Sequence, residues 1–198
     1  MSSIMTESAK LPRRRQFFRE SVRSVLRPLA DYLDRRLGSK GSRPRAWLRP
    51  PGALAEAAFL ETCFRCGNCV AACPAQAIRP LESTDDVLRN TPIIVPDLAA
   101  CVVCDELACM KVCPSGALKL VDSPLLIRMG LAVVDHSVCV RSSGEDCMIC
   151  VDRCPLGAQA IRVDELRRIQ VLQPGCVGCG VCQLYCPTQP KAITVEAL

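Results

Sequence analysis

Two stretches of the chain, CFRCGNCVAACP at residues 63–74 and CVGCGVCQLYCP at residues 176–187, carry four cysteines with the same spacing. In both, the pattern Cys-x2-Cys-x2-Cys-x3-Cys is followed at once by proline. Three closely spaced thiolates on a tight loop can surround one face of a 4Fe–4S cluster, and the fourth then reaches a second cluster. Proline turns the chain away without leaving a free N–H, because its φ is fixed and it has no amide hydrogen.

Two further cysteine groups lie between these stretches and vary the pattern. The second group has two extra residues between its second and third cysteines, and the third group has a first gap of seven residues. The cysteines supply enough thiolates for four 4Fe–4S clusters. The sixteen candidate metal-binding ligands are Cys63, Cys66, Cys69 and Cys73 (group one), Cys101, Cys104, Cys109 and Cys113 (group two), Cys139, Cys147, Cys150 and Cys154 (group three), and Cys176, Cys179, Cys182 and Cys186 (group four).

Zinc and disulfides are the two alternative uses of these cysteines. A zinc ribbon needs two separated Cys pairs, whereas groups one and four each pack four cysteines into eleven residues and end in proline. A disulfide framework needs an oxidising compartment, and no apolar run of a cleavable secretory signal follows the basic start of the chain. Both alternatives are therefore less favoured than iron–sulfur clusters.

Glycines between the ligands distinguish the groups from one another. Gly67, Gly178 and Gly180 lie between cysteines of groups one and four, where a missing Cβ lets backbone N–H groups approach cluster sulfur atoms. Group two has no such glycine, and group three has only Gly144 in its long gap. Because hydrogen bonds to sulfur raise the reduction potential, we expect unequal potentials among the clusters.

A repeated unit of cysteine group, proline and apolar pair predicts an α+β fold of two ferredoxin-like units, each binding two clusters. Strands are expected at 92–95, 131–134 and 169–172, and AIRVDELRRIQVL at 160–172 reads as a hairpin. Group one instead follows AEAAFLETC, which looks helical. The hairpin favours pairing group three with group four. The repeated apolar pairs are Ala77-Ile78, Ala117-Leu118, Ala160-Ile161 and Ala192-Ile193.

The first fifty residues differ in composition from the rest of the chain. They hold 13 Lys or Arg against 4 Asp or Glu, whereas residues 51–198 hold 12 against 16. We divide the chain into a basic helical leader at 1–37, a linker rich in Gly, Ser and Pro at 38–52, and a four-cluster domain at 53–198. Apolar residues at helical spacing within 18–37 predict an N-terminal amphipathic helix that can dock on a membrane surface, on a partner or on the cluster domain itself; nucleic acid is not an expected partner.

Several motifs resemble those of the ferredoxin-type proteins NapG and MauM, which are found with periplasmic nitrate reductase and methylamine utilisation. They are RPPGAL at 49–54, CFRCGNCVAACP at 63–74, CVVCDELACMKVCPSGAL at 101–118, MGLAVVDHSVC at 129–139 and CMICVDRCP at 147–155. The resemblance implies that all sixteen cysteines are ligands and that the protein relays electrons. Group two also resembles electron-transfer subunits of molybdopterin oxidoreductases, which implies the other pairing: groups two and three nested inside one and four.

The leader gives two expectations for localisation. Arg14-Arg15-Gln16-Phe17-Phe18-Arg19 is similar to the twin-arginine export motif of NapG-like proteins, which implies a periplasmic location. However, charged residues interrupt the segment that follows, where export needs an apolar run. We therefore expect a cytoplasmic protein, which the leader can attach to a membrane, and keep periplasmic export as the alternative.

The functional hypothesis is electron transfer between a redox donor and a redox acceptor, as a relay to a redox enzyme or as one of its subunits. The sequence has no Gly-rich nucleotide motif and no persuasive nucleophile arrangement, so we expect a carrier and not an enzyme, with no catalytic residues. The alternative is an assembly or maturation factor for a redox enzyme, with the leader as its docking element.

Overall fold

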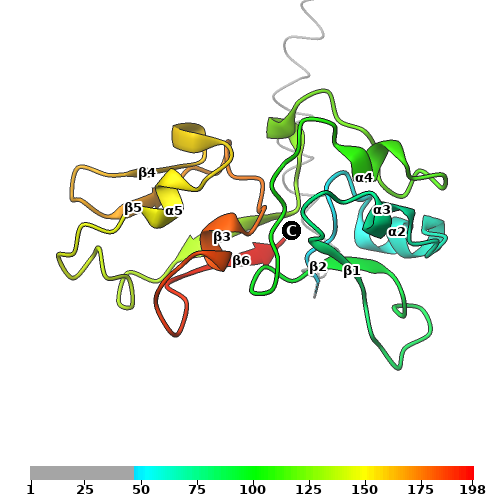
Figure 1. The fold of residues 1–198 in the computed structure, drawn as a ribbon, viewed down its shortest axis with the longest axis horizontal. Helices are drawn as coiled ribbons and strands as arrows, with labels where there is room; N and C mark the ends of the chain where they lie inside the picture. Colours follow the sequence, from blue (N-terminus) through cyan, green and yellow to red (C-terminus); the bar gives the residue numbers. More distant parts are fainter. Residues whose placement is uncertain (1–46) are drawn as a thin grey trace, which may run out of the picture. The chain divides into compact units, whose positions relative to one another are not determined.

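Five short α-helices and three two-stranded sheets form the described part of the chain, which bears all the cysteines (Figure 1). The computed structural model describes residues 47–198. The expected amphipathic helix and twin-arginine-like motif within 1–37, and most of the expected linker, lie outside the described residues. Within residues 47–198, no helix is both long enough and apolar enough to cross a bilayer.

The first half of the described chain, residues 47–122, contains groups one and two. Its sheet pairs β1 with β2 antiparallel, with Ile78 opposite Ile94. The expected helix before group one is confirmed as α2, and the expected strand at 92–95 is confirmed as β2. The elements are α2 (Glu56–Thr62), α3 (Asn68–Ala71), β1 (Ile78–Pro80), β2 (Pro92–Ile94) and α4 (Ala108–Lys111).

The second half, residues 129–198, contains groups three and four and follows a 3-10 turn at Pro124–Leu126. Its strands β4 and β5 form the predicted hairpin, and β3 pairs antiparallel with the last strand, β6. In Figure 1, β3 and β6 lie between the α5, β4 and β5 elements and those of the first half. The elements are β3 (Gly130–Val134), α5 (Ile149–Asp152), a 3-10 turn (Gly157–Gln159), β4 (Ile161–Val163), β5 (Ile169–Val171), α6 (Val181–Leu184) and β6 (Ile193–Ala197).

The same local design recurs in all four cysteine groups. The third cysteine of each group lies within a four-residue helix, namely α3, α4, α5 or α6. A helix this short gains little from its own hydrogen bonds, so packing and ligation must hold it. The apolar pair after each group is buried in every case, with the eight side chains 1–3% exposed. These pairs fix each cysteine group to the core.

The core continues across the two halves. Phe59 of α2 is fully buried, and the same cluster of apolar side chains includes Met129 and Val177 from the second half. A second cluster lies within the second half around Ile161 and Ile193. The α+β class is therefore confirmed, with few aromatic residues in its core.

One boundary of the domain differs from the prediction. Leu48, Arg49 and Pro50 belong by composition to the expected linker at 38–52, yet they are buried. Leu48 accepts a hydrogen bond from the Ile94 N–H (2.8 Å), and Arg49 binds Glu56 and Thr91. This end of the segment is part of the packed domain, because long-range contacts that composition cannot reveal hold it there.

Candidate iron–sulfur sites

Four pockets in the structure are each lined by four cysteines. Every pocket takes the first three cysteines of one group and the fourth cysteine of another. This is the sharing that the Cys-x3-Cys spacing predicts for paired clusters. The pockets are site A (Cys63, Cys66, Cys69, Cys113), site B (Cys73, Cys101, Cys104, Cys109), site C (Cys139, Cys147, Cys150, Cys186) and site D (Cys154, Cys176, Cys179, Cys182).

The pockets decide which groups are neighbours. Groups one and two share sites A and B, and groups three and four share sites C and D. The nested arrangement, with groups two and three inside one and four, is therefore wrong for this chain. The physical reason is that α3 packs on α4 and α5 packs on α6, so each fourth cysteine emerges beside the group of the neighbouring helix.

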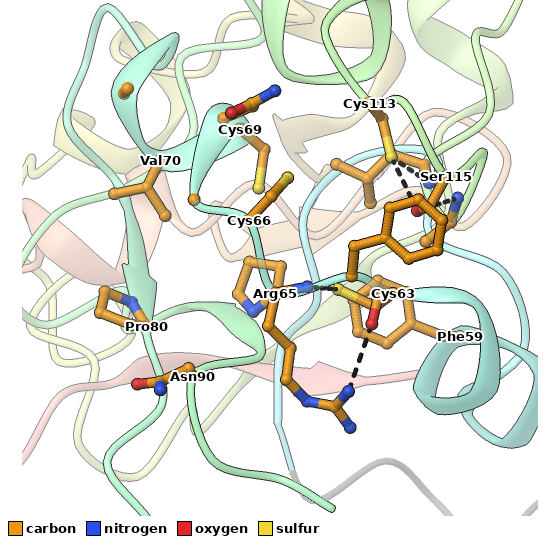
Figure 2. Close-up of a pocket in the computed structure, with 17 residues that line it drawn as sticks. Phe59, Cys63, Arg65, Cys66, Cys69, Val70, Pro80, Asn90, Cys113 and Ser115 are labelled. Atoms are coloured by element: carbon orange, nitrogen blue, oxygen red, sulfur yellow. Dashed lines mark hydrogen bonds between the residues drawn. The ribbon is translucent and has the colours of Figure 1, made fainter.

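Site A, which Figure 2 shows in close-up, has the largest cavity of the four sites. Its cavity volume is about 370 Å³, whereas the other three are each about 20 Å³. Cys66 is exposed, and it is the only exposed cysteine of the sixteen, all of which lie in the described part of the chain. Phe64 beside it is 69% exposed. Water can therefore reach site A more easily than the other sites.

Backbone N–H groups already point at the cysteine sulfur atoms. The Arg65 N–H donates to the sulfur of Cys63 at 3.4 Å, as Figure 2 shows, and the Val103 N–H donates to that of Cys101 at the same distance. The Ala77 N–H donates to Cys73 at 3.3 Å. Such bonds favour a negatively charged sulfur, as cluster ligation requires.

Group two replaces the missing glycines with residues in the left-handed conformation. Val103 has φ 51° and Leu107 has φ 45°, at the positions where group four has Gly178 and Gly180. A β-branched residue is strained in this conformation. The described N–H donors to sulfur in groups one and two include Arg65, Ala77 and Val103, so the expected approach at Gly67, Gly178 and Gly180 stays a prediction. The sequence carried no signal that Val103 and Leu107 adopt the same left-handed conformation as Gly178 and Gly180.

Burial makes the thiols reluctant to ionise without metal. It raises the pKa of Cys101, Cys109 and Cys179 to about 12, and repulsion from neighbouring cysteine sulfurs adds to the effect. The pKa of Cys182 is raised further by the same causes. Because iron is bound by thiolates, positive charge inside each pocket must offset this cost.

Two cysteines have lowered pKa values instead. For Cys113, burial favours the neutral thiol, but hydrogen bonds from the Leu118 N–H and from Ser115 outweigh it and lower the pKa. For Cys186, burial is likewise outweighed, first by the hydrogen bond with Thr188. These two cysteines line sites A and C.

Sites B and D adjoin each other. The backbone N–H of Cys101, which lines site B, donates to the carbonyl of Cys179, which lines site D, at 2.9 Å. Gly178 beside it packs on the backbone of Gly130, where an added Cβ would lie 2.3 Å from the nitrogen. A and C are therefore the outer sites of the arrangement, and B and D are the inner sites.

The long gap of group three is closed by one buried arginine. Arg141 is 8% exposed and donates to the Asp146 carboxylate at 2.7 Å and to the carbonyl of Cys147 at 3.2 Å. The hydrogen bond and the charge of Arg141 lower the pKa of Asp146. The seven-residue gap thus folds back so that Cys139 and Cys147 line the same pocket.

The donor set fits iron–sulfur clusters. Each site offers four cysteine thiols, backbone donors to sulfur are present, and apolar residues line the pockets. Among residues 47–198, no group of three or more His, Cys, Asp or Glu side chains is arranged to hold a metal ion. A cubane is larger than one ion and needs its four sulfur ligands farther apart.

These features define a ferredoxin-type iron–sulfur protein. The family model described as "4Fe-4S dicluster domain" matches residues 62–117, and that described as "4Fe-4S binding domain" matches residues 173–189. The first match spans groups one and two together, in agreement with the pockets that they share. The cofactors are 4Fe–4S clusters, and the sixteen cysteines are sufficient for four.

Curated relatives narrow the class to one family. The chain is 35% identical to methylamine utilization ferredoxin-type protein MauM of Methylophilus methylotrophus, in an alignment that covers 97% of this chain and 89% of the relative. It is 36% identical to ferredoxin-type protein NapG of Escherichia coli K12, in an alignment that covers 98% of this chain and 90% of the relative. The chain therefore belongs to the NapG and MauM family of ferredoxin-type proteins, and it is an electron carrier and not a catalytic enzyme.

Solved structures resemble the chain only weakly. The formate dehydrogenase–heterodisulfide reductase–formylmethanofuran dehydrogenase complex of Methanospirillum hungatei aligns with a TM-score of 0.28 and 21% identity, over 70% of this chain and 51% of that chain. A likeness this low carries no argument about function.

Proposed function

We propose that sites A, B, C and D each bind one 4Fe–4S cluster, so that the chain consists of two ferredoxin-like units with two clusters each. The observation that carries this proposal is the composition of the pockets: each has three cysteines from one group and the fourth from its neighbour. When bound, the clusters supply reversible one-electron oxidation and reduction. The residues of the chain hold them, donate hydrogen bonds to their ligands and leave less space for water at sites B, C and D than at site A.

The proposed role is a relay of electrons between a redox donor and a redox acceptor, as a separate carrier or as a subunit of a redox enzyme. The family assignment supports this, since the relatives are named ferredoxin-type proteins and one is named for methylamine utilization. Because the inner sites B and D adjoin each other, electrons can pass between the two halves of the chain. We expect the two partners to be proteins with their own redox cofactors.

The first experiment is an analysis of iron and acid-labile sulfide per chain in protein purified without oxygen, together with an EPR spectrum after reduction. We expect about sixteen of each and signals of reduced cubanes, because four 4Fe–4S clusters contain that number. Little iron after careful reconstitution, with zinc in its place, would contradict the proposal.

The second candidate function, an assembly or maturation factor, keeps the clusters as structural or regulatory elements. It is suggested by the basic leader, which carries none of the cysteines. Removing residues 1–37 separates the two functions. A relay should retain its reducible clusters and its electron exchange with small mediators, whereas a docking factor should lose its partner.

For localisation we propose the cytoplasm, with residues 1–37 as the segment that docks on a membrane surface or a partner; the alternative is periplasmic export by the twin-arginine pathway. Arg14→Lys together with Arg15→Lys tests this in the native host. An unchanged distribution between cytoplasm and periplasm supports the proposal, whereas loss of a periplasmic pool would show export.

A further inference from the structure

A hydroxyl side chain lies beside the fourth cysteine of two groups. Ser115 lies two residues after Cys113, and its oxygen is 3.6 Å from that sulfur. Thr188 lies two residues after Cys186, and its oxygen is 3.2 Å from that sulfur. Both cysteines line outer sites, Cys113 in site A and Cys186 in site C.

The inner sites lack this feature. The residue two positions after Cys73 is Ala75, and the residue two positions after Cys154 is Leu156. These cysteines line sites B and D. The two pairs of sites therefore differ in one chemical group at an equivalent position.

The direction of each hydroxyl hydrogen follows from its other bond. The Ser115 oxygen accepts a hydrogen bond from the Ala117 N–H at 3.3 Å, and the Thr188 oxygen accepts one from the Ala192 N–H at 2.8 Å. A backbone donor thus occupies one side of each oxygen. A cysteine bound to iron is a thiolate without a hydrogen, so only the hydroxyl can donate between the two atoms.

We propose that the hydroxyls of Ser115 and Thr188 raise the reduction potentials of the clusters in sites A and C. A hydrogen bond to a ligand sulfur stabilises the more negative, reduced state of a cluster. Thr188 has the shorter contact and so has the larger effect. This inference rests on the proposed function, because it requires clusters in all four sites.

The consequence is a difference in reduction potential between the outer sites, A and C, and the inner sites, B and D. Sites B and D meet at the hydrogen bond between Cys101 and Cys179, whereas A and C are separated from each other by them. The hydroxyl contribution favours an added electron at the two outer sites, where redox partners can reach it. At site A this agrees with the exposure of Cys66.

The test is an EPR-monitored redox titration of the full-length holoprotein, prepared without oxygen. Wild type is compared with Ser115→Ala and Thr188→Val, which remove the hydroxyl, and with the matched variants Ser115→Thr and Thr188→Ser, which retain it. We expect Ser115→Ala to shift one potential to a more negative value and Thr188→Val to shift a different one further. The hydroxyl-retaining variants should keep the wild-type values.

Assignment of the signals comes from Cys66→Ala, which removes an exposed ligand of site A. The signal that shifts in Ser115→Ala should be the one altered or lost in Cys66→Ala. If Thr188→Val loses its cluster, the Ser115 pair of variants decides the question alone, because Ser115 makes the longer bond and its loss disturbs the site less.

Unchanged potentials in Ser115→Ala and Thr188→Val, with all four clusters present, would overturn the inference and leave the electron-transfer function intact. An equal shift in Thr188→Ser and Thr188→Val would also overturn it, since packing and not the hydroxyl would then be responsible. Absence of any reducible cluster in the wild type would instead overturn the proposed function itself.

Discussion

The two halves of the described chain carry the same cysteine design on different supports. In the second half, the five-residue strands β3 and β6 pair antiparallel over their full length, and groups three and four lie between them in the sequence. In the first half this sheet is reduced to a single bridge between Ala53 and Leu118, and α2 stands before the first cysteine. A buried aromatic ring and an ion pair replace the missing strands.

The difference shows that ligand spacing and supporting structure are separable. Site A, in the half without the long sheet, has a cavity of about 370 Å³ and the exposed Cys66, whereas the cavities of sites B, C and D are each about 20 Å³. We infer that the second half is the more rigid holder of clusters and that the first half exposes one. The predictions below test this contrast, beginning with the largest effect.

Removing a ligand should have very different consequences in the two halves. Cys66→Ala should cost only the cluster of site A, about four of sixteen iron atoms, because Cys66 is exposed. Cys182→Ala should cost about eight or more, because Cys182 is buried in the core of the second half and cluster binding is coupled to folding there. Iron and sulfide analysis of both variants measures this, and equal losses would contradict the contrast.

The core side chains give the next test. Phe59 is fully buried, and the Arg49 guanidinium lies 4.8 Å from its ring centre. Phe59→Ala should destabilise the holoprotein by about 4 kcal/mol, since the cavity cannot be filled by neighbouring strands. Ile161→Val in the second half removes one methyl group and should cost about 1 kcal/mol.

The two variants are ranked by urea denaturation under anaerobic conditions, in which the visible absorbance of the clusters is measured after a fixed incubation time. In Phe59→Ala, the clusters of sites A and B should be lost first, and those of C and D later. Simultaneous loss of all four would show that the halves do not differ in their support.

Much of the fold and most of the site could be predicted from local sequence. The sixteen cysteines, the helix before group one and the hairpin at β4 and β5 follow from spacing and periodicity. The hairpin also indicated the correct pairing of groups three and four, whereas resemblance to other enzymes indicated the wrong one.

The remainder depended on contacts that are distant in sequence. Arg49 lies in a segment with the composition of a linker, and only its bonds to Glu56 and Thr91 place it in the core. Val103 has a left-handed backbone conformation, which β-branched residues disfavour, and it lies in the loop between Cys101 and Cys104. The hydroxyl of Ser115 had a signal in the sequence, since Ser or Thr follows Cys-Pro in groups two and four only, but its bond to sulfur required the structure.

Two ion pairs provide a third contrast between the halves. Arg49 is fully buried and binds Glu56, whose side chain is 28% exposed, at 2.5 Å. Glu56→Gln should cost about 3 kcal/mol, because it weakens the pairing of a buried charge. Asp146→Asn in the second half should have a much smaller effect at neutral pH, since Asp146 is 73% exposed.

The pH dependence of the Asp146 pair has a defined sign. The Arg141 hydrogen bond and charge lower the pKa of Asp146 from its ordinary value of 3.8. The stability that this pair adds is therefore present above that value and is lost as the pH falls through the lowered pKa. In anaerobic stopped-flow measurements, wild type and Asp146→Asn should release iron from site C at different rates near neutral pH, and the difference should shrink as the pH falls below 3.8. A difference that persists in acid would mean that the carboxylate charge is not the cause.

The smallest effect on stability is expected for substitutions at two glycines that have the same backbone conformation in the two halves. Gly67 and Gly180 both precede the third cysteine by two residues and have φ 77° and 87°. Gly67→Ala should cost about 1 kcal/mol, the strain of a left-handed residue, because an added Cβ meets nothing within 4 Å. Gly180→Ala should cost more, since its Cβ would lie 2.8 Å from Pro96 of the first half and press the halves apart. The loss of cluster absorbance on heating, recorded at one scan rate, gives a midpoint temperature for each variant. Equal midpoints would show that the contact between the halves adjusts to the added Cβ without cost, which would contradict the rigidity inferred for the second half.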